Sequence, residues 1–285
     1  MHGVPARAVL LLSSRWPDRT PGSHRGAPVL TGVRGDTEVA DPSVGRVPDL
    51  RAAIDQVRAG IARACDRAGR TSNEVVLVAV TKTVSIEAIR TARTMGLEHF
   101  AENYAGELAE KAPLVPATWH FVGKLQTGTA PRVADHADVV HSAEPGRALE
   151  RMAARAARRG KQIRCLVQVD FTGRRQGVSP EEVVEFLGTA EGLAGIEPVG
   201  LMTLPPWTED PEATRPWFAK LRELRDQLRE VRPGLTELSM GMSGDYEVAV
   251  EEGATMVRVG TALFGPRPPD RVPDSDRSPG RRGPR

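Results

Sequence analysis

Short apolar, β-branched runs alternate with amphipathic stretches along most of this chain. Continuous apolar runs are typical of strands buried on both faces of a parallel sheet, and the helical spacing between them indicates covering helices. The expected strands are 75–81, 99–103, 119–123, 138–142, 163–170, 198–204, 237–241 and 256–261. The expected helices between them are 85–95, 104–112, 127–135, 145–159, 180–192, 211–231 and 245–253, with one more before the first strand at 49–69.

Eight strand–helix repeats predict an α/β fold, specifically a single (β/α)8 TIM barrel with an extra N-terminal helix. A doubly wound open sheet is the competing architecture, but no Gly-rich dinucleotide fingerprint follows the first strand. The barrel is expected to span residues 48–268. The flanking segments, 1–47 and 269–285, are rich in Gly, Pro and Arg without periodicity and are expected to be disordered. Whether residues 1–47 belong to the native protein stays open.

Charge and composition exclude several classes of function. The net charge of the chain is +2, with +2 in residues 1–47 and +3 in residues 266–285, so residues 48–265 carry −3. A mildly acidic barrel argues against nucleic-acid binding. No apolar stretch is long enough to span a membrane, and the apolar run 8–12 is too short for a secretory signal. The two cysteines have no metal-ligand spacing, and the expectation is a cytoplasmic monomer with polar helix exteriors.

Candidate chemistry gathers at the predicted carboxyl ends of the strands, where barrels place their functional residues. Lys82 follows the first strand, and the small residues 241–244 follow the seventh. Together with Gly260 and the hydroxyl group of Thr261 after the eighth strand, they can form a phosphate-binding loop of backbone N–H groups, with a helix beginning directly behind it. A lysine opposite a phosphate site suits a phosphorylated aldehyde, of which pyridoxal 5′-phosphate (PLP) is the common example. Arg258 is then placed to reach the pyridine nitrogen of that cofactor.

Each of these residues also has a structural interpretation. Lys82 can be an ordinary loop lysine, and Ser243 and Thr261 can be helix caps. Arg258 can form an ion pair with Glu102. His120 and His141 can each satisfy a hydrogen bond in the core, or they can contact a ligand.

The motifs at these strand ends resemble the PLP homeostasis protein family. They occupy residues 78–82, 102–104, 119–126, 141–142, 200–203, 237–246 and 257–265, of which the block Ser-Met-Gly-Met-Ser-Gly-Asp at 239–245 is the most specific. The chain departs from the family pattern at three places: Ala101 stands for the usual Gly, Lys124 stands for a common His, and Arg174 and Arg175 lie in a segment where many relatives have a lysine.

The resemblance implies a type III PLP-binding fold, similar to the N-terminal domain of alanine racemase and without a second β domain. It implies that Lys82 holds PLP covalently as a Schiff base and that Arg258 faces the pyridine nitrogen. The further cofactor-binding residues that it implies are Asn103 at the ring, and Met242, Ser243, Gly244, Gly260 and Thr261 at or near the phosphate.

Three functions are compatible with these residues. The resemblance favours a protein of PLP (vitamin B6) homeostasis that carries or buffers PLP without catalytic turnover, with PLP-dependent apoenzymes as recipients. The alternative is a slow PLP-dependent amino-acid racemase, which would need the closing domain and catalytic tyrosine that alanine racemases use. The third is a barrel hydrolase or isomerase that binds a phosphorylated substrate.

Overall fold

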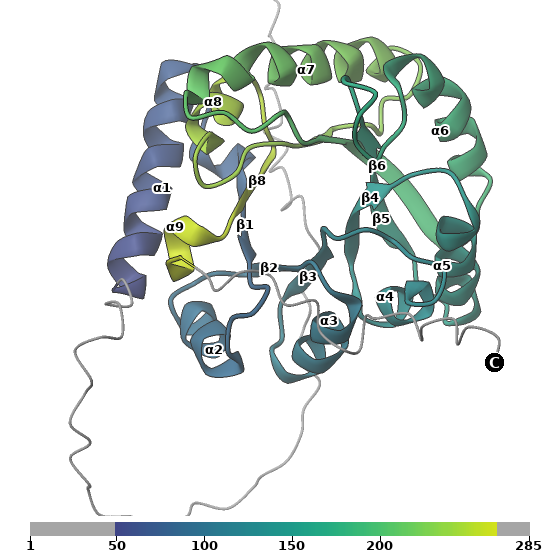
Figure 1. The fold of residues 1–285 in the computed structure, drawn as a ribbon, viewed down its shortest axis with the longest axis horizontal. Coiled ribbons are helices and arrows are strands. Elements are labelled where there is room, and N and C mark those ends of the chain that lie inside the picture. The colour runs from purple at the N-terminus through teal and green to yellow at the C-terminus, as the bar shows by residue number, and fades with distance from the viewer. Residues whose placement is uncertain (1–48, 267–285) are drawn as a thin grey trace, which may run out of the picture. The chain divides into compact units, whose positions relative to one another are not determined.

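The computed structural model describes residues 49–266, which form a closed barrel of eight parallel strands in chain order (Figure 1). The strands are β1 (Val76–Val80), β2 (His99–Glu102), β3 (Thr118–Phe121), β4 (Val139–Ala143), β5 (Ile163–Val169), β6 (Ile196–Thr203), β7 (Glu237–Ser239) and β8 (Met256–Val259). Pairing of β8 with β1 closes the barrel, and Val78 lies opposite Arg258 in that register. The predicted TIM barrel is therefore confirmed, and the open sheet is excluded for the described residues.

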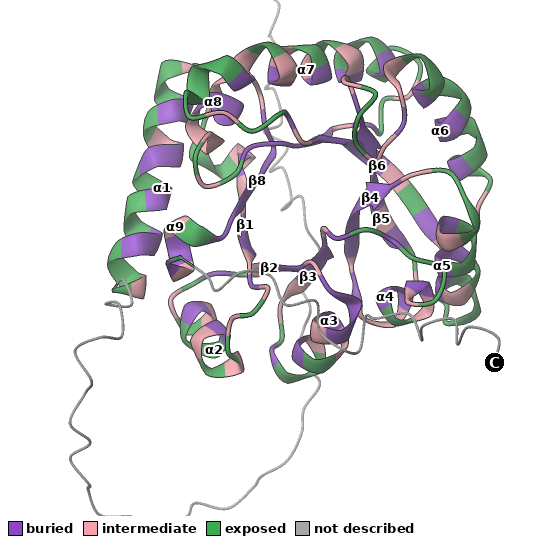
Figure 2. Ribbon diagram, viewed as in Figure 1, coloured by how far each residue is buried: buried purple, intermediate pink, exposed green. Residues whose placement is uncertain are grey.

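Helices surround the barrel and bury one face each against it (Figure 2). They are α1 (Leu50–Arg67), α2 (Ile86–Thr94), α3 (Ala105–Lys111), α4 (Ala130–His136), α5 (Arg147–Arg158), α6 (Val183–Glu191), α7 (Arg215–Arg229), α8 (Tyr246–Glu251) and α9 (Thr261–Phe264). Short 3-10 turns lie at η1 (Ser72–Glu74), η2 (Ala112–Leu114), η3 (Pro180–Glu182) and η4 (Pro211–Thr214). No helix of the described part of the chain is both long and apolar enough to cross a membrane.

The helix starts follow from local sequence. The side chain of Asp49 accepts a hydrogen bond from the backbone N–H of Arg51 at 3.0 Å, and that of Ser85 accepts one from Ala88 at 3.3 Å. Such caps satisfy backbone donors that the first turn of a helix leaves without partners. The extra helix before the first strand is confirmed as α1.

Strand ends differ from the expectation at two places that matter for the site. β7 ends at Ser239, because Gly241 takes a φ of 88° that continues no strand. The sequence predicts that the eighth strand ends at Thr261, but this residue begins α9 instead. Both differences turn the chain into tight loops at the carboxyl end of the barrel. The segments expected to be disordered, 1–47 and 269–285, lie outside the described residues.

The interior of the barrel is partly polar. The ring of His141 on β4 contacts the hydroxyl group of Ser239 on β7, at 2.7 Å between Nδ1 and Oγ. Because β4 and β7 are not neighbours in the barrel, this contact crosses its interior. The helix-facing side chains of β3, Trp119 and Phe121, belong instead to the apolar core between strands and helices.

Candidate functional site

A cavity of about 560 Å³ lies at the carboxyl ends of the strands. Its lining includes all the residues named as cofactor contacts from the sequence: Lys82, Asn103, Met242, Ser243, Gly244, Arg258, Gly260 and Thr261. A volume of this size is typical of a small-molecule site. The fold therefore brings the whole predicted set to one place.

Lys82 follows β1 directly after the buried residue Thr81 and is itself partly buried. The next residue, Thr83, has a φ of 62°, a left-handed conformation that is uncommon for any residue other than glycine and strained for a β-branched one. Such a conformation persists only where surrounding contacts hold it. The backbone at Lys82 is thus held in one particular shape.

Three charged side chains supply the contacts that hold the backbone at Thr83. They are Lys111, Glu102 and Glu107, and we call them the Lys111 clamp. The ammonium group of Lys111 donates to the carbonyl oxygen of Thr81 at 2.8 Å, to Glu102 at 2.9 Å and to Glu107 at 2.5 Å. Glu107 in turn accepts the backbone N–H of Thr83 at 2.8 Å. The clamp therefore makes hydrogen bonds to the backbone on both sides of Lys82.

Glu102 is the buried member of the clamp. Its side chain is 0% exposed, its Oε1 accepts the hydroxyl group of Thr81 at 2.6 Å, and its Oε2 has no hydrogen-bond partner. Burial raises the pKa of this carboxyl group to about 7, against the charge of Lys111, which favours the ionised form. The ion pair of Glu102 with Arg258 that the sequence left open is not formed, because Glu102 pairs with Lys111 instead.

Backbone N–H groups converge on one oxygen at the other wall of the cavity. The hydroxyl oxygen of Ser243 accepts from the N–H of Gly260 at 3.2 Å and from that of Ala262 at 3.3 Å. Both donors therefore already point at an oxygen atom beside the cavity, as donors to a phosphate group would. A Cβ atom added at Gly244 would meet nothing within 4 Å, so that side of the loop is open.

The turn before this wall depends on glycine. At Gly241 a Cβ atom would lie 2.5 Å from the Cβ of Ala249 and 3.0 Å from the Cα of Tyr246, in addition to the strain of a positive φ. Asp245 then accepts the N–H of Met242 at 2.6 Å and closes the loop. Burial raises the pKa of Asp245, opposed by its own hydrogen bonds and by the charge of Arg258.

Arg258 lies in β8 with its guanidinium group in the barrel interior. It donates to the hydroxyl oxygen of Ser239 at 2.5 Å and to the carbonyl oxygen of Thr203 at 3.1 Å. Burial lowers the pKa of Arg258 to about 10, opposed by the charge of Asp245. The group is therefore still cationic at neutral pH, and it acts only as a hydrogen-bond donor.

Sequence reasoning missed one wall of the cavity. The loop 204–209 after β6 lines it, as does Arg175, and Trp207 within that loop is 79% exposed. The pattern Leu-Pro-Pro-Trp after the sixth strand was the available signal, because loops at this end of a barrel carry function. Lys124, which departs from the family pattern, is exposed and is not among the lining residues.

Side chains that could hold a metal ion do not gather here. Among the described residues, no group of three or more His, Cys, Asp or Glu side chains has a suitable arrangement. Both cysteines, Cys65 and Cys165, are buried free thiols away from the cavity. The lining offers an amine, a buried guanidinium group and a loop with convergent backbone N–H groups.

Comparisons with known proteins agree with this arrangement. Residues 52–268 match the family model described as alanine racemase, N-terminal domain. The chain is 40% identical over 220 residues to a pyridoxal phosphate homeostasis protein of Aquifex aeolicus, covering 75% of this chain and 96% of that protein. A similar protein of Pseudomonas aeruginosa, with the same description, is 38% identical over 220 residues, covering 75% of this chain and 94% of that one.

Solved structures give the same result. PipY of Synechococcus elongatus, solved with PLP bound, superposes with a TM-score of 0.67 at 33% identity and covers 76% of this chain and 100% of its own. Alanine racemase of Clostridium difficile superposes with a TM-score of 0.61 at 16% identity, covering 80% of this chain and 59% of the racemase. At that identity the second likeness shows a shared barrel fold only.

Proposed function

The chain belongs to the family of pyridoxal phosphate homeostasis proteins, and from this premise we propose that it holds PLP as a Schiff base on Lys82 and serves in intracellular PLP homeostasis. The single observation that carries the proposal is the shared cavity. One 560 Å³ space joins a lysine amine, a buried arginine and a loop of convergent N–H groups. These are the groups that an aldehyde, a pyridine nitrogen and a phosphate require.

The residues present fit the cofactor group by group. Lys82 would supply the amine for the aldehyde carbon, and Asn103 would line the ring. The N–H groups of Gly260 and Ala262, which now meet the oxygen of Ser243, would bind phosphate oxygens with Gly244 and Thr261. Met242 belongs to the same wall. When bound, PLP supplies an electrophilic carbon that forms and releases a bond to an amine.

Arg258 would donate an N–H to the pyridine nitrogen. Since a guanidinium group has no acceptor and stays charged, it would keep that nitrogen unprotonated. An unprotonated ring withdraws electrons weakly, and this supports holding the cofactor rather than using it for turnover.

We propose a carrier or buffer of PLP as the role, with PLP-dependent apoenzymes as recipients and the cytoplasm as the compartment. Two free thiols in the described core suit a reducing compartment. A slow racemase is the less favoured alternative, because the chain has only two tyrosines, Tyr104 and Tyr246, and neither lines the cavity. A monomer remains our expectation for the assembly.

The visible absorbance spectrum tests the binding proposal. Adding PLP to the purified protein should produce the band of lysine-bound PLP with one equivalent at saturation. Lys82→Ala should lose the band, and Lys124→Ala, which changes an exposed lysine outside the cavity, should keep it. A band of equal intensity in Lys82→Ala would reject this lysine as the attachment point, and no band in the parent protein would reject PLP binding.

Deuterium exchange separates the carrier from the racemase. Amino acids incubated with the PLP-bound protein in heavy water should keep their α-protons. Exchange at an enzymatic rate, about 1 per second or faster, for any amino acid would refute the carrier role.

A further inference from the structure

Three histidines on neighbouring strands form a continuous hydrogen-bonded row through the barrel. Nδ1 of His99 lies 3.0 Å from Nε2 of His120, and Nδ1 of His120 lies 2.8 Å from Nε2 of His141. Nδ1 of His141 then lies 2.7 Å from the hydroxyl oxygen of Ser239, which Arg258 also contacts. The row therefore ends on the arginine of the proposed cofactor site.

The donor and the acceptor of every hydrogen bond in this row follow from Arg258, the group at its end. Arg258 can only donate, so the oxygen of Ser239 accepts from it. Ser239 is fully buried and has a single hydroxyl hydrogen, and its other side-chain contact in the described structure is Nδ1 of His141. Satisfying that buried hydrogen requires Ser239 to donate to His141.

The same argument gives the direction of the hydrogen bonds between the imidazole rings. A neutral imidazole whose Nδ1 accepts must carry its proton on Nε2. His141 therefore donates from Nε2 to His120, and His120 donates from Nε2 to His99. All donations run away from Arg258, and each histidine in the row is the Nε2–H tautomer.

The histidines have to be neutral for this order to hold, and their surroundings favour that form. Burial lowers the pKa of His99 to about 4, and the charge of Arg164 on β5 adds to this effect. Burial also lowers the pKa of His120 and His141 well below the ordinary value, helped by neighbouring histidines, by Arg164 at His120 and by Arg258 at His141. At neutral pH no second cation therefore lies in the row beside Arg258.

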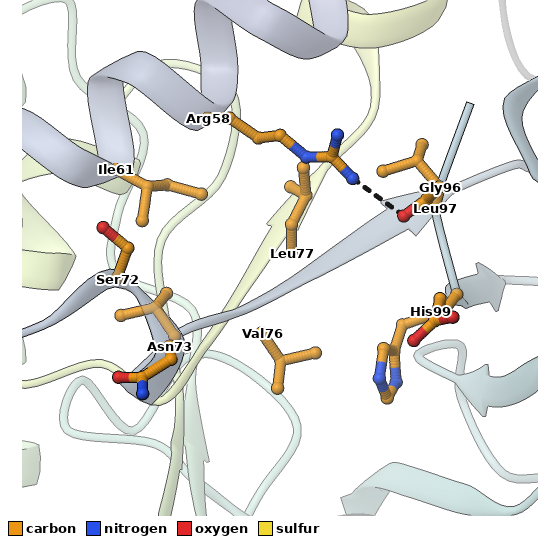
Figure 3. A pocket seen from close by; sticks show the side chains of 11 residues that line it. Arg58, Ile61, Ser72, Asn73, Val76, Leu77, Gly96, Leu97 and His99 are labelled. Atoms are coloured by element: carbon orange, nitrogen blue, oxygen red, sulfur yellow. Dashed lines mark hydrogen bonds between the residues drawn. The ribbon is translucent and has the colours of Figure 1, made fainter. Parts of the chain in front are cut away.

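The far end of the row reaches a second pocket. His99 opens β2, at the amino ends of the strands, and it borders a pocket of about 520 Å³ whose lining includes Arg58, Asn73 and Val76 (Figure 3). The cofactor cavity lies at the carboxyl ends of the strands and shares no lining residue with this pocket. The row thus connects the two ends of the barrel interior.

We propose that Ser239, His141, His120 and His99 are positioning residues, a one-way hydrogen-bond chain that orients Arg258 toward the pyridine nitrogen and couples that contact to the pocket at the opposite end of the barrel. The positioning role rests on the proposed function, whereas the chain itself is a property of the ligand-free protein. The chain acts through Arg258, and none of its members touches the cofactor cavity.

The tautomers are measurable without any cofactor. Nitrogen-15 shifts of the imidazole rings in ligand-free protein at neutral pH should show His99, His120 and His141 as neutral Nε2–H tautomers. In Ser239→Ala, His141 loses the donor that fixes its tautomer, and its Nδ1 shift should move the most. A Nδ1–H tautomer or a protonated ring at any of the three positions in the parent protein would overturn the chain.

The positioning role is tested on the PLP-bound protein. His141→Leu removes both contacts, and we expect a shifted visible band and PLP affinity about three- to tenfold weaker, the effect of one lost hydrogen bond. His141→Gln retains an acceptor and a donor and should restore the parental band. His136→Gln, on the outer helix α4, is the matched histidine control and should leave band and affinity unchanged.

Two smaller substitutions test the positioning role with less risk of misfolding. His99→Gln and Ser239→Ala alter the two ends of the chain, and both should shift the band in a protein that still unfolds cooperatively. Parental bands and affinities in all of these variants would refute the positioning role alone. A parent protein that takes up no PLP would instead refute the proposed function, and the imidazole shifts would then still decide whether the chain exists.

Discussion

Thr83 takes a left-handed conformation next to the residue proposed to bind PLP, and the Lys111 clamp explains how that conformation is held. The sequence identified Lys82 because it follows a strand in a barrel, a rule that needs only the order of elements. The clamp was not predicted, since it joins side chains on β2 and α3 to the backbone after β1. The spacing of residues within one element carries no information about a contact among three elements.

Removing the clamp's cation should weaken the site. In Lys111→Met the carbonyl of Thr81 and the carboxylates of Glu102 and Glu107 lose their shared donor. We expect PLP affinity to fall about tenfold or more, the effect of losing a charged hydrogen bond. Absorbance titration measures this, with Lys161→Met as control, because Lys161 also donates to a buried backbone carbonyl, that of Ala137, but away from the cavity. Equal losses in both variants would contradict a specific role of the clamp.

Glu102 should make stability depend on pH in a predictable direction. Its folded pKa, about 7, lies above the unfolded value near 4.3, so the folded state holds this proton more tightly. The stabilisation is complete below about pH 4.3 and is lost as pH rises toward 7.

Comparison with Glu102→Gln isolates this effect. The free energy of unfolding of the parent should fall relative to the variant by about 1.4 kcal/mol per pH unit between those two values, and no further above them. Urea denaturation of both proteins at several pH values measures the difference. Parallel stability curves would show that Glu102 is ionised throughout this range in the folded protein.

His120 and His141 show the limit of prediction at this scale. Their sequence positions suggested core histidines that satisfy hydrogen bonds, and they do contact each other. That the same row continues to Ser239 and Arg258 depends on which side chains meet across the barrel, and strand order alone does not give that information.

At the scale of elements, periodicity predicted all eight strands and the main helices, because burial on one or both faces leaves a direct record in the sequence. The residues at which strands and helices end are harder to predict from the sequence. The sequence predicts a strand that runs to Thr261, but the chain turns at Gly260 and α9 begins at Thr261. That turn directs the N–H groups of Gly260 and Ala262 toward the cavity wall.

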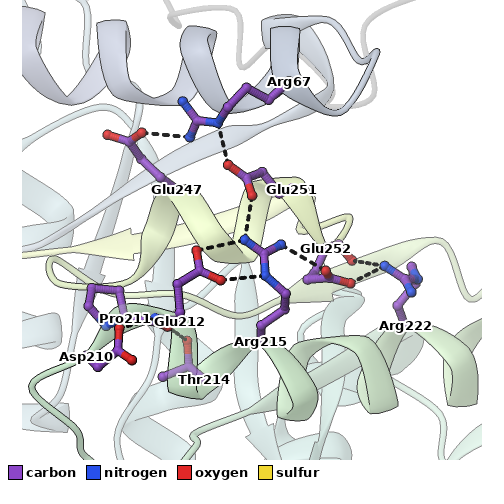
Figure 4. Close-up of polar contacts among 10 residues, drawn as sticks. All are labelled: Arg67, Asp210, Pro211, Glu212, Thr214, Arg215, Arg222, Glu247, Glu251 and Glu252. Atoms are coloured by element: carbon purple, nitrogen blue, oxygen red, sulfur yellow. Dashed lines mark hydrogen bonds and ion pairs between the residues drawn. The ribbon is translucent and has the colours of Figure 1, made fainter.

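Ion pairs join helices α1, α7 and α8 on the outside of the barrel (Figure 4). Arg67 of α1 contacts Glu247 and Glu251 of α8, and Arg215 of α7 contacts Glu251 at 2.7 Å and also pairs with Glu252 at 3.0 Å. Hydrogen bonds to the carboxylates of Glu212, Glu251 and Glu252 raise the pKa of Arg215, although its partial burial acts in the opposite direction. The network fixes the additional helix α1 against the last strand–helix units.

Replacing Arg215, the arginine at the centre of this ion-pair network, should lower the stability of the fold modestly. We expect Arg215→Met to lower the free energy of unfolding by about 1 kcal/mol, a typical value for a partly exposed ion pair, and to leave PLP binding intact. Arg229→Met, on an exposed position of the same helix, is the control. Chemical denaturation at low and high salt measures both, and an equal effect of the two substitutions would contradict a network centred on Arg215.

At the scale of the whole described barrel, residues 49–266, the two pockets lie toward its two ends. The carboxyl end carries the amine, the guanidinium group and the loop proposed to bind phosphate, and the interior row extends from there toward the amino end. A ligand that binds only the folded barrel stabilises it by mass action.

PLP should therefore raise the melting temperature. At a free concentration about 100 times its Kd, the gain is about 2.7 kcal/mol, which corresponds to roughly 5–10 °C for a domain of this size. Pyridoxal, which has the aldehyde and ring but no phosphate, is the matched ligand control and should give a much smaller shift at the same concentration. Equal shifts for the two compounds would contradict a phosphate site at residues 243–244 and 260–262.

The central claim, that Lys82 holds PLP, is tested most directly by fixing the bond and locating it. Borohydride reduction of the PLP-loaded protein, followed by proteolysis and mass spectrometry, should place the pyridoxyl group on Lys82 in nearly all modified molecules. A pyridoxyl group found mainly on another lysine, such as Lys111 or Lys124, would contradict the assignment of the site.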